Sequence, residues 1–360
     1  MIDLVGAYAR SEARTITRRA AIEAVGKFRG GGAGGERERV TLEEERGFSG
    51  AGGRGDEEER FMLAADVEEK EELEWSKSLK TSVWLSLVLT QRQGLSRFQD
   101  WQLVLASLGR HAFVGVFYGI LWWHVGDGEV SERVGILFFS LVFIMLSNQQ
   151  NIPYIFQDRL QYYREKGAGV YGEFPYWWSI TLAQVPLAVL NSVIYSSLVY
   201  WMCGLNNSDP GRFGYFTGVM ILSNLVALSF CQMLASFTRL EETAVALFPV
   251  ALFSFIAFGG FIVRLPTLPE YLRAWAPTIS FVRWALQGLV VNEFEGNDRV
   301  FPIPEAIPVT PDEVFRSFLA AYGFDNGISK LTVLPILVAN LFVFRVLTLM
   351  FLRLVNFEKR

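Results

Sequence analysis

The chain has 360 residues and a formal net charge of −4, and 51% of its residues are apolar and 14% aromatic. This length could hold two or three soluble domains. The charges, however, gather in residues 1–80, whereas most of the remaining chain consists of long apolar runs. Because a helix that crosses a bilayer needs about 20 mostly apolar residues, the pattern excludes an ordinary soluble protein and predicts an all-α, multi-pass membrane protein.

The polar beginning of the chain contains a segment rich in glycine and in blocks of like charge, residues 30–78. Such a segment cannot bury enough apolar area to offset its chain entropy, so we expect a disordered linker. Its GGGAGGERER stretch lacks the Lys and Ser/Thr of a phosphate-binding loop. Residues 1–20 hold no apolar stretch typical of a secretory signal, so we expect the first span to direct membrane insertion.

An amphipathic helix is predicted over residues 79–97. Val83, Trp84, Leu87 and Val88 recur at helical spacing in this stretch. Basic residues flank it, namely Lys77, Lys80, Arg92 and Arg97. We expect this helix to lie along the inner face of the membrane and to connect to the first span.

Six apolar runs follow, and we predict six transmembrane helices at residues 102–124, 134–156, 174–203, 213–237, 243–263 and 331–352. The third run is too long for one straight crossing. Pro175 and Pro186 predict a bent or tilted helix, or an entry segment that lies in the membrane interface. Arg110 and His111 interrupt the first run near one end. We expect the Arg110 side chain to reach back to the headgroups, and a buried functional charge is the alternative.

Orientation follows from Lys and Arg in the short loops. The connection at 158–173 carries Arg159, Arg164 and Lys166, and the tail beyond the last run is also basic. With six spans, cytosolic N- and C-termini place both basic segments inside. We therefore predict a multi-pass protein of the plasma membrane or of an organelle membrane, with both termini in the cytosol.

The long segment before the last run, 265–294, is apolar and aromatic but is interrupted by prolines at 266, 269 and 277. We predict an extracellular pair of short helices that dips back into the outer leaflet. The triplet Asn206-Asn207-Ser208 is a possible glycosylation site at Asn206. Cys203 and Cys231 lie in or beside apolar runs and are expected to be packing residues.

The sequence offers little chemistry of its own. We find no nucleophile–base pair and no metal-ligand cluster, because the two histidines, His111 and His124, cannot build a metal site alone. We therefore expect no catalytic residue, no bound cofactor or metal and no nucleic-acid partner. An ion-driven secondary transporter would need paired acidic residues inside its spans, and Glu241 and Glu242 lie only at an edge.

Several ordered motifs resemble one known family. The stretch QDRLQYYREKGAGVYGEFPYWWSITLAQVP, residues 157–186, is similar to the loop after the second span of G-subfamily ABC transporters, the white and pleiotropic-drug-resistance type. Asp158 stands where that family usually has Glu, and Tyr162 where it usually has Phe. Four further stretches resemble its later motifs in order: YWMCGL at 200–205, GGFIV at 259–263, RWALQGLVVNEFEG at 283–296 and FRVLTLMFLRL at 344–354. The resemblance covers residues 80–360.

The resemblance implies an ABC-2 type transmembrane domain over residues 79–360, and a coupling helix at 158–171 that transmits movement of an ATPase domain to the spans. The matching coupling-helix positions are Arg159, Tyr163, Arg164, Glu165 and Tyr171. From the residues alone, a basic loop attracted to anionic lipid is an equal alternative.

The resemblance also implies a substrate cavity at Phe143, Leu146, Leu252, Phe253 and Ile256, which would select apolar or amphipathic molecules by burial and stacking. Phe261 and Ile262 occupy the position of a hydrophobic valve. This chain departs from the family by carrying Phe there, which weakens that interpretation. Such side chains are more often plain packing residues, since a Phe on a span usually contacts lipid or another helix.

Partners follow from the same resemblance. Such a half-transporter works as a homodimer or heterodimer, binds a hydrophobic small molecule or lipid within the membrane, and uses ATP and Mg²⁺ on an ATPase domain. Residues 1–29 resemble the end of that domain, so we expect a truncated gene model or a fragment, with a separate membrane subunit as the alternative. A truncated membrane protein that dimerises with intact partners without transporting is the rival function.

Overall fold

The computed structural model describes residues 81–125, 130–295, 311–324 and 329–355. The predicted segments 1–29 and 30–78 lie outside these residues. The described residues are helical, with no strand among them, which confirms the all-α prediction. The chain divides into two units. The larger unit comprises the described residues within 88–161 and 176–355, and the smaller one comprises 81–87 and 162–175.

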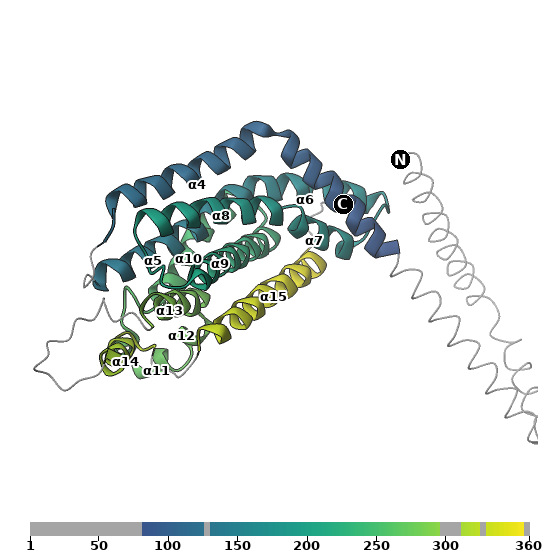
Figure 1. The fold of residues 1–360 in the computed structure, drawn as a ribbon. Helices are drawn as coiled ribbons and strands as arrows, with labels where there is room; N and C mark the ends of the chain where they lie inside the picture. The colour runs from purple at the N-terminus through teal and green to yellow at the C-terminus, as the bar shows by residue number, and fades with distance from the viewer. Residues whose placement is uncertain (1–80, 126–129, 296–310, 325–328, 356–360) are drawn as a thin grey trace, which may run out of the picture. The chain divides into compact units, whose positions relative to one another are not determined.

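The helices appear in the predicted order (Figure 1). A first helix covers residues 81–99. It is followed by α4 (Trp101–Leu121), α5 (Val130–Leu146), the 3₁₀ helix η1 (Ser147–Asn151), α6 (Ile152–Gly167), α7 (Glu173–Leu182), α8 (Val185–Met202), α9 (Pro210–Phe237) and α10 (Glu241–Ala257). The short elements η2 (Leu265–Thr267), α11 (Glu270–Arg273) and α12 (Ala276–Ile279) precede α13 (Phe281–Phe294), α14 (Pro311–Tyr322) and α15 (Lys330–Leu354).

Among the described residues, five helical stretches are long and apolar enough to cross a membrane: Trp101–Leu121, Val130–Gly167, Glu173–Met202, Pro210–Phe237 and Lys330–Leu354. The remaining predicted span corresponds to α10, which has 17 residues. At 1.5 Å per residue it is about 25 Å long, shorter than the roughly 30 Å hydrocarbon core. It ends before Gly259 and Gly260, and Gly260 has a φ of +93°. Whether α10 crosses the bilayer stays a prediction.

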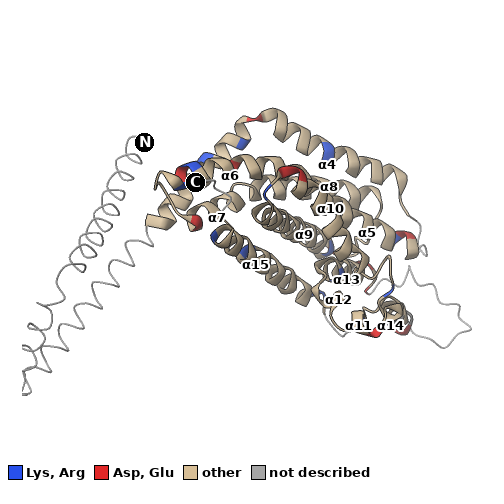
Figure 2. Ribbon diagram, turned by 180° about the vertical axis from the view of Figure 1, so that it is seen from behind, with Lys and Arg blue, Asp and Glu red and all other residues tan. Residues whose placement is uncertain are grey.

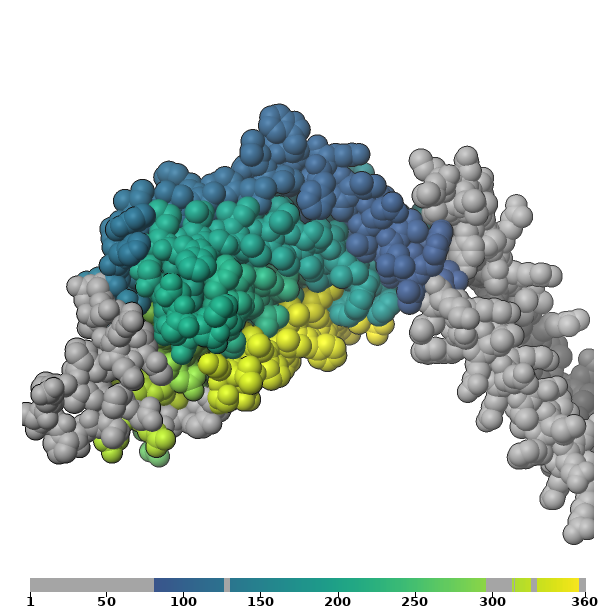
Figure 3. Space-filling model, in the orientation of Figure 1, coloured from purple at the N-terminus to yellow at the C-terminus, as the bar shows by residue number. Residues whose placement is uncertain are grey.

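The larger unit is built around α9, which packs against α8, α13 and α15, while α4 packs on α8. In the apolar stretch of α9, 72% of the residues are buried, against 22% in α4 and 28% in α15. The latter two lie at opposite edges of this unit (Figures 1 and 3). Since few charges interrupt these helices (Figure 2), the exposed apolar faces of α4 and α15 suit contact with lipid.

The third span is bent, as its prolines predict. α7 ends at Leu182 and α8 begins at Val185, with Pro186 in its first turn, where a missing N–H is tolerated. The segment at 265–294 contains short helices, as predicted, and their position in the outer leaflet stays a prediction. α11 and α12 are single turns. In the next helix, α13, every residue from Phe281 to Phe294 except Arg283 is buried. Gly288 permits this close packing, because a Cβ there would lie 2.9 Å from Val333 on α15.

Candidate functional site

The predicted coupling segment begins on α6 and turns after Gly167. Within the smaller unit, the Tyr171 hydroxyl donates to the Glu165 carboxylate, and Lys166 Nζ lies 2.7 Å from Glu173 Oε1. Gly169 provides the left-handed backbone of the turn, with a φ of +70°. These contacts join the end of α6 to the residues that lead into α7, so the segment is a closed turn.

The predicted coupling residues differ in their surroundings. Arg164 is exposed and Tyr163 is half-buried, so both can contact another domain. Arg159 is buried. Its guanidinium donates to the carbonyl oxygens of Ala235, Thr238 (2.7 Å) and Arg239 (3.1 Å) at the end of α9. Arg159 therefore anchors α6 to α9, a packing role that the sequence alone does not reveal.

The second span is interrupted in its middle by η1, whose sequence is SNQQN. Three of its four amides reach different helices: Asn148 Nδ2 donates to Asn224 Oδ1 on α9 (2.7 Å), Gln149 Nε2 to the Val245 carbonyl on α10 (3.1 Å) and Gln150 Nε2 to Ser107 Oγ on α4 (3.4 Å). A stretch of 3₁₀ helix inside a longer helix often marks a hinge. The polar contacts thus join α5 and α6 to three other helices at this break.

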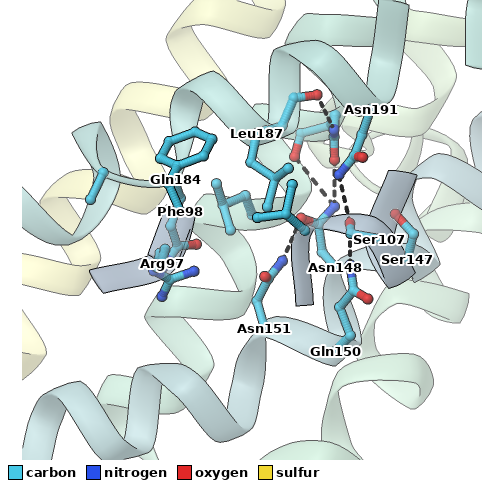
Figure 4. A pocket seen from close by; sticks show the side chains of 15 residues that line it. Arg97, Phe98, Ser107, Ser147, Asn148, Gln150, Asn151, Gln184, Leu187 and Asn191 are labelled. Atoms are coloured by element: carbon cyan, nitrogen blue, oxygen red, sulfur yellow. Dashed lines mark hydrogen bonds between the residues drawn. The ribbon is translucent and has the colours of Figure 1, made fainter. Parts of the chain in front are cut away.

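A small cavity of about 30 Å³ lies beside η1 (Figure 4). Asn191 Nδ2 donates to Ser107 Oγ at 2.9 Å, but Asn191 Oδ1 and both polar atoms of Gln184 are buried without a hydrogen-bond partner in the described structure. Buried amides without partners are rare and destabilising. The cavity has room for at least one water molecule that could satisfy them.

The structure brings together only part of the predicted substrate cavity. Phe143 and Leu146 line an open groove of about 630 Å³, together with residues of α4 and Val245 of α10. On α10, Leu252 and Ile256 are buried, whereas the Phe253 side chain is 58% exposed. None of these three α10 side chains lines the groove.

The predicted valve residues have separate environments. The Phe261 ring stacks on Phe138 with centroids 4.3 Å apart, while Ile262 is half exposed. The proposed glycan acceptor, Asn206, uses its Nδ2 to donate to the Glu293 carbonyl at 2.9 Å. Glycosylation would have to break that bond. The structure leaves both roles as predictions.

Two buried polar contacts were missed by the sequence interpretation. Arg133 on α5 pairs with Glu293 on α13 at 2.6 Å, and burial raises the pKa of Glu293 while the Asn206 N–H and Arg133 oppose that rise. Arg345 on α15 donates to Gln232 Oε1 at 2.5 Å and lies over the Trp177 ring. The sequence signal that could have identified both contacts is an isolated charged residue inside an apolar segment. No group of three metal-ligating side chains occurs among the described residues.

Helices that can cross a bilayer, joined internally by buried amide and guanidinium contacts, define an integral, multi-pass membrane protein. Residues 85–294, more than half of the chain, match the family model described as ABC-2 type transporter. The chain belongs to this family.

The curated relatives agree with this assignment. The chain is 32% identical over 194 residues to ABC transporter G family member 2 of Dictyostelium discoideum, a match covering 54% of this chain and 14% of that protein. It is 25% identical over 272 residues to the ABC transporter ATP-binding protein/permease wht-1 of Caenorhabditis elegans, covering 74% and 38%. Pleiotropic drug resistance protein 1 of Nicotiana tabacum is 26% identical over 257 residues, covering 69% and 17%. The chain thus spans well under half the length of these relatives.

Proposed function

We propose that this chain is the membrane-spanning permease part of an ATP-driven exporter of lipid-like or other hydrophobic or amphipathic compounds. The observation that carries the proposal is a turn joined directly to a long membrane helix. Tyr171 and Lys166 close the turn on Glu165 and Glu173, and α6 continues from it into the second span. A helix of this kind can transmit a rigid-body shift from a soluble domain to helices in lipid.

An ATPase domain would bind ATP and Mg²⁺ and hydrolyse the ATP. Its conformational change would then move the turn at the end of α6. The chain itself contributes binding surface and the moving helices, and it is not an enzyme alone. The half-buried Tyr163 and the exposed Arg164 are the contacts offered to that domain. Arg159 fixes α6 to α9 through its hydrogen bonds. A displacement of the turn by the ATPase domain would therefore move both helices together.

Substrate crosses between two copies of such a domain, in a homodimer or a heterodimer. The open groove lined by Phe143 and Leu146 supports this arrangement, since a second copy would complete its wall. Large apolar side chains on α5 and α10 are exposed, including Phe139, Val250 and Phe253. They suit a partner helix or lipid. The basic turn favours a cytosolic position for both termini, in the plasma membrane or an organelle membrane.

Vesicle transport tests this function. Inside-out vesicles are prepared from cells that express the chain together with the ATPase domain of a G family relative, and from cells that express that domain alone. We expect ATP, but not AMP, to drive uptake of at least one member of a panel of fluorescent amphipathic compounds, only when the chain is present. Equal uptake without the chain would overturn the proposal. If the chain instead lowers the export of an intact half-transporter expressed beside it, the non-transporting alternative is correct.

A further inference from the structure

Arg110 lies deep in the first span. It is the tenth residue of α4, about 13 Å along the axis from Trp101, in a hydrocarbon core roughly 30 Å thick. Its Nε and Nη2 atoms are buried and have no hydrogen-bond partner in the described part of the chain, and it forms no ion pair there. Snorkelling would solvate donors that face the headgroups, but two donors of Arg110 are buried against the protein instead.

Arg110 is one of the residues that line the open groove of about 630 Å³, a volume typical of sites for small ligands. The groove is polar at one end and apolar at the other. Its polar end is formed by Arg110, Gln149 and Gln150, and Gln150 is tied to α4 by its bond to Ser107. At its apolar end Tyr118 lies beside Phe143, with ring centroids 6.4 Å apart.

The two ends are far enough apart to hold one amphipathic molecule. Arg110 and Tyr118 are eight residues apart on α4, which corresponds to about 12 Å along the helix. No Asp or Glu lines the groove. A cation with unfilled donors in a low-dielectric site strongly favours an anion as its partner. Nη1, the guanidinium nitrogen that is not buried, can donate a charge-assisted hydrogen bond to a carboxylate or sulfate.

We propose that this groove selects amphipathic substrates with one acidic group, whose anion binds Arg110 while their apolar part lies against Tyr118, Phe143 and Leu146. This inference rests on the proposed export function, because it names the substrate class of the same membrane domain. Arg110 would bind an acid more tightly than its neutral ester. The aromatic wall would contact the apolar part of both molecules equally.

The test is direct binding to the purified 360-residue chain in nanodiscs of zwitterionic lipid. The probes are pyrenebutyrate and its methyl ester, which share the apolar part and differ in the anion. We expect the carboxylate to bind at least tenfold more tightly than the ester. Equal affinities for the wild-type chain would overturn the proposal, and this comparison requires no substitution.

Variants then assign the effect to one residue. Arg110→Gln should raise the Kd of the carboxylate at least tenfold and leave that of the ester unchanged, whereas Arg110→Lys should keep a part of the preference. Phe143→Ala should weaken both probes by a similar factor. Arg239→Gln, at an exposed arginine outside the groove, is the matched control and should change neither Kd. An unchanged preference in Arg110→Gln, at normal thermal stability, would overturn the role of Arg110.

A lipid headgroup is the competing source of the anion. Nanodiscs that contain phosphatidylserine distinguish the two, since a substrate site should keep its affinity for pyrenebutyrate there. Loss of probe binding in that lipid, with less phosphatidylserine copurifying with Arg110→Gln, would identify a lipid site and overturn the substrate assignment. Binding is measured without ATP or an ATPase domain. A negative binding result would therefore overturn this inference without contradicting the proposed export function, which the vesicle transport experiment tests separately.

Discussion

Arg133 Nη1 lies 2.6 Å from Glu293 Oε1, and this ion pair joins the first turn of α5 to the last turn of α13 across 160 residues of sequence. Both side chains are buried. Glu293 also accepts the Asn206 N–H, and Arg133 donates to the Val125 carbonyl at 2.9 Å. The pair therefore holds α5, α13 and the loop between α8 and α9 at one end of the bundle.

Breaking this pair from one side should destabilise the protein strongly. Arg133→Gln leaves the Glu293 carboxylate buried without its cation, which typically costs about 3–5 kcal/mol. We expect a clear fall in the thermal unfolding midpoint of the detergent-purified chain. The double variant Arg133→Met, Glu293→Leu removes both charges and should recover much of the loss, because the desolvation penalty disappears with them.

Lys330 and Glu295 provide the matched control. They form an ion pair of 3.1 Å, but their side chains are 33% and 52% exposed. Solvent screens such a pair, so Lys330→Gln should change stability by at most about 1 kcal/mol. Equal midpoints for Arg133→Gln and Lys330→Gln would contradict the structural importance of the buried pair.

The spans were predictable because long runs without charge have few alternatives to a membrane. Pro186 likewise predicted the break between α7 and α8, since proline terminates a helix at a defined place. The predicted end of the fifth run at residue 263 was too late. The helix stops at Ala257, because Gly260 takes a left-handed conformation that the apolar pattern does not register.

The site was less predictable because its contacts join residues distant in sequence. Asn148 bonds to Asn224 and Arg345 to Gln232, at separations of 76 and 113 residues. The local sequence pattern predicts which helix carries each residue, but it does not predict which faces of the helices pack against each other. Arg159 is an example. Its place in a basic loop indicated an exposed side chain that contacts an ATPase domain, whereas the structure shows a buried side chain bonded to carbonyls at the end of α9.

Cysteine labelling tests the orientation. Ser208→Cys lies in the exposed turn before α9, and Gly167→Cys at the exposed end of α6. A membrane-impermeant maleimide added to intact cells should label Ser208→Cys and spare Gly167→Cys until the membrane is permeabilised. The native Cys203 and Cys231 are buried and should contribute little background. The reverse labelling pattern would place the basic turn outside and refute cytosolic termini.

Arg159 should act on folding more than on communication with an ATPase domain. Arg159→Gln removes donors from three carbonyls at the end of α9, and each buried acceptor left without a donor costs about 1–3 kcal/mol. We expect lower yield and a lower unfolding midpoint. Arg164→Gln, at an exposed cation five residues later, should leave both unchanged. Similar midpoints for the two variants would argue against the anchoring role.

Glu165→Arg should separate coupling from folding in a transporter that includes the ATPase domain. The substitution removes the acceptor of the Tyr171 hydroxyl and adds a cation beside Arg164 and Lys166. Like charges in a partly desolvated contact repel, and the loss of one such contact typically costs about 2–5 kcal/mol.

Assembly should survive in Glu165→Arg, because the turn lies outside lipid, while substrate should no longer stimulate ATP hydrolysis in nanodiscs. Tyr171→Phe deletes the internal hydrogen bond without adding charge, so it measures how much of the effect comes from a loosened turn. Glu242→Arg reverses an exposed acid on α10 and should leave stimulation unchanged. If the turn only attracts anionic lipid, Glu165→Arg should strengthen that attraction and leave substrate-stimulated ATP hydrolysis intact. Full stimulation in a normally assembled variant would exclude the coupling role.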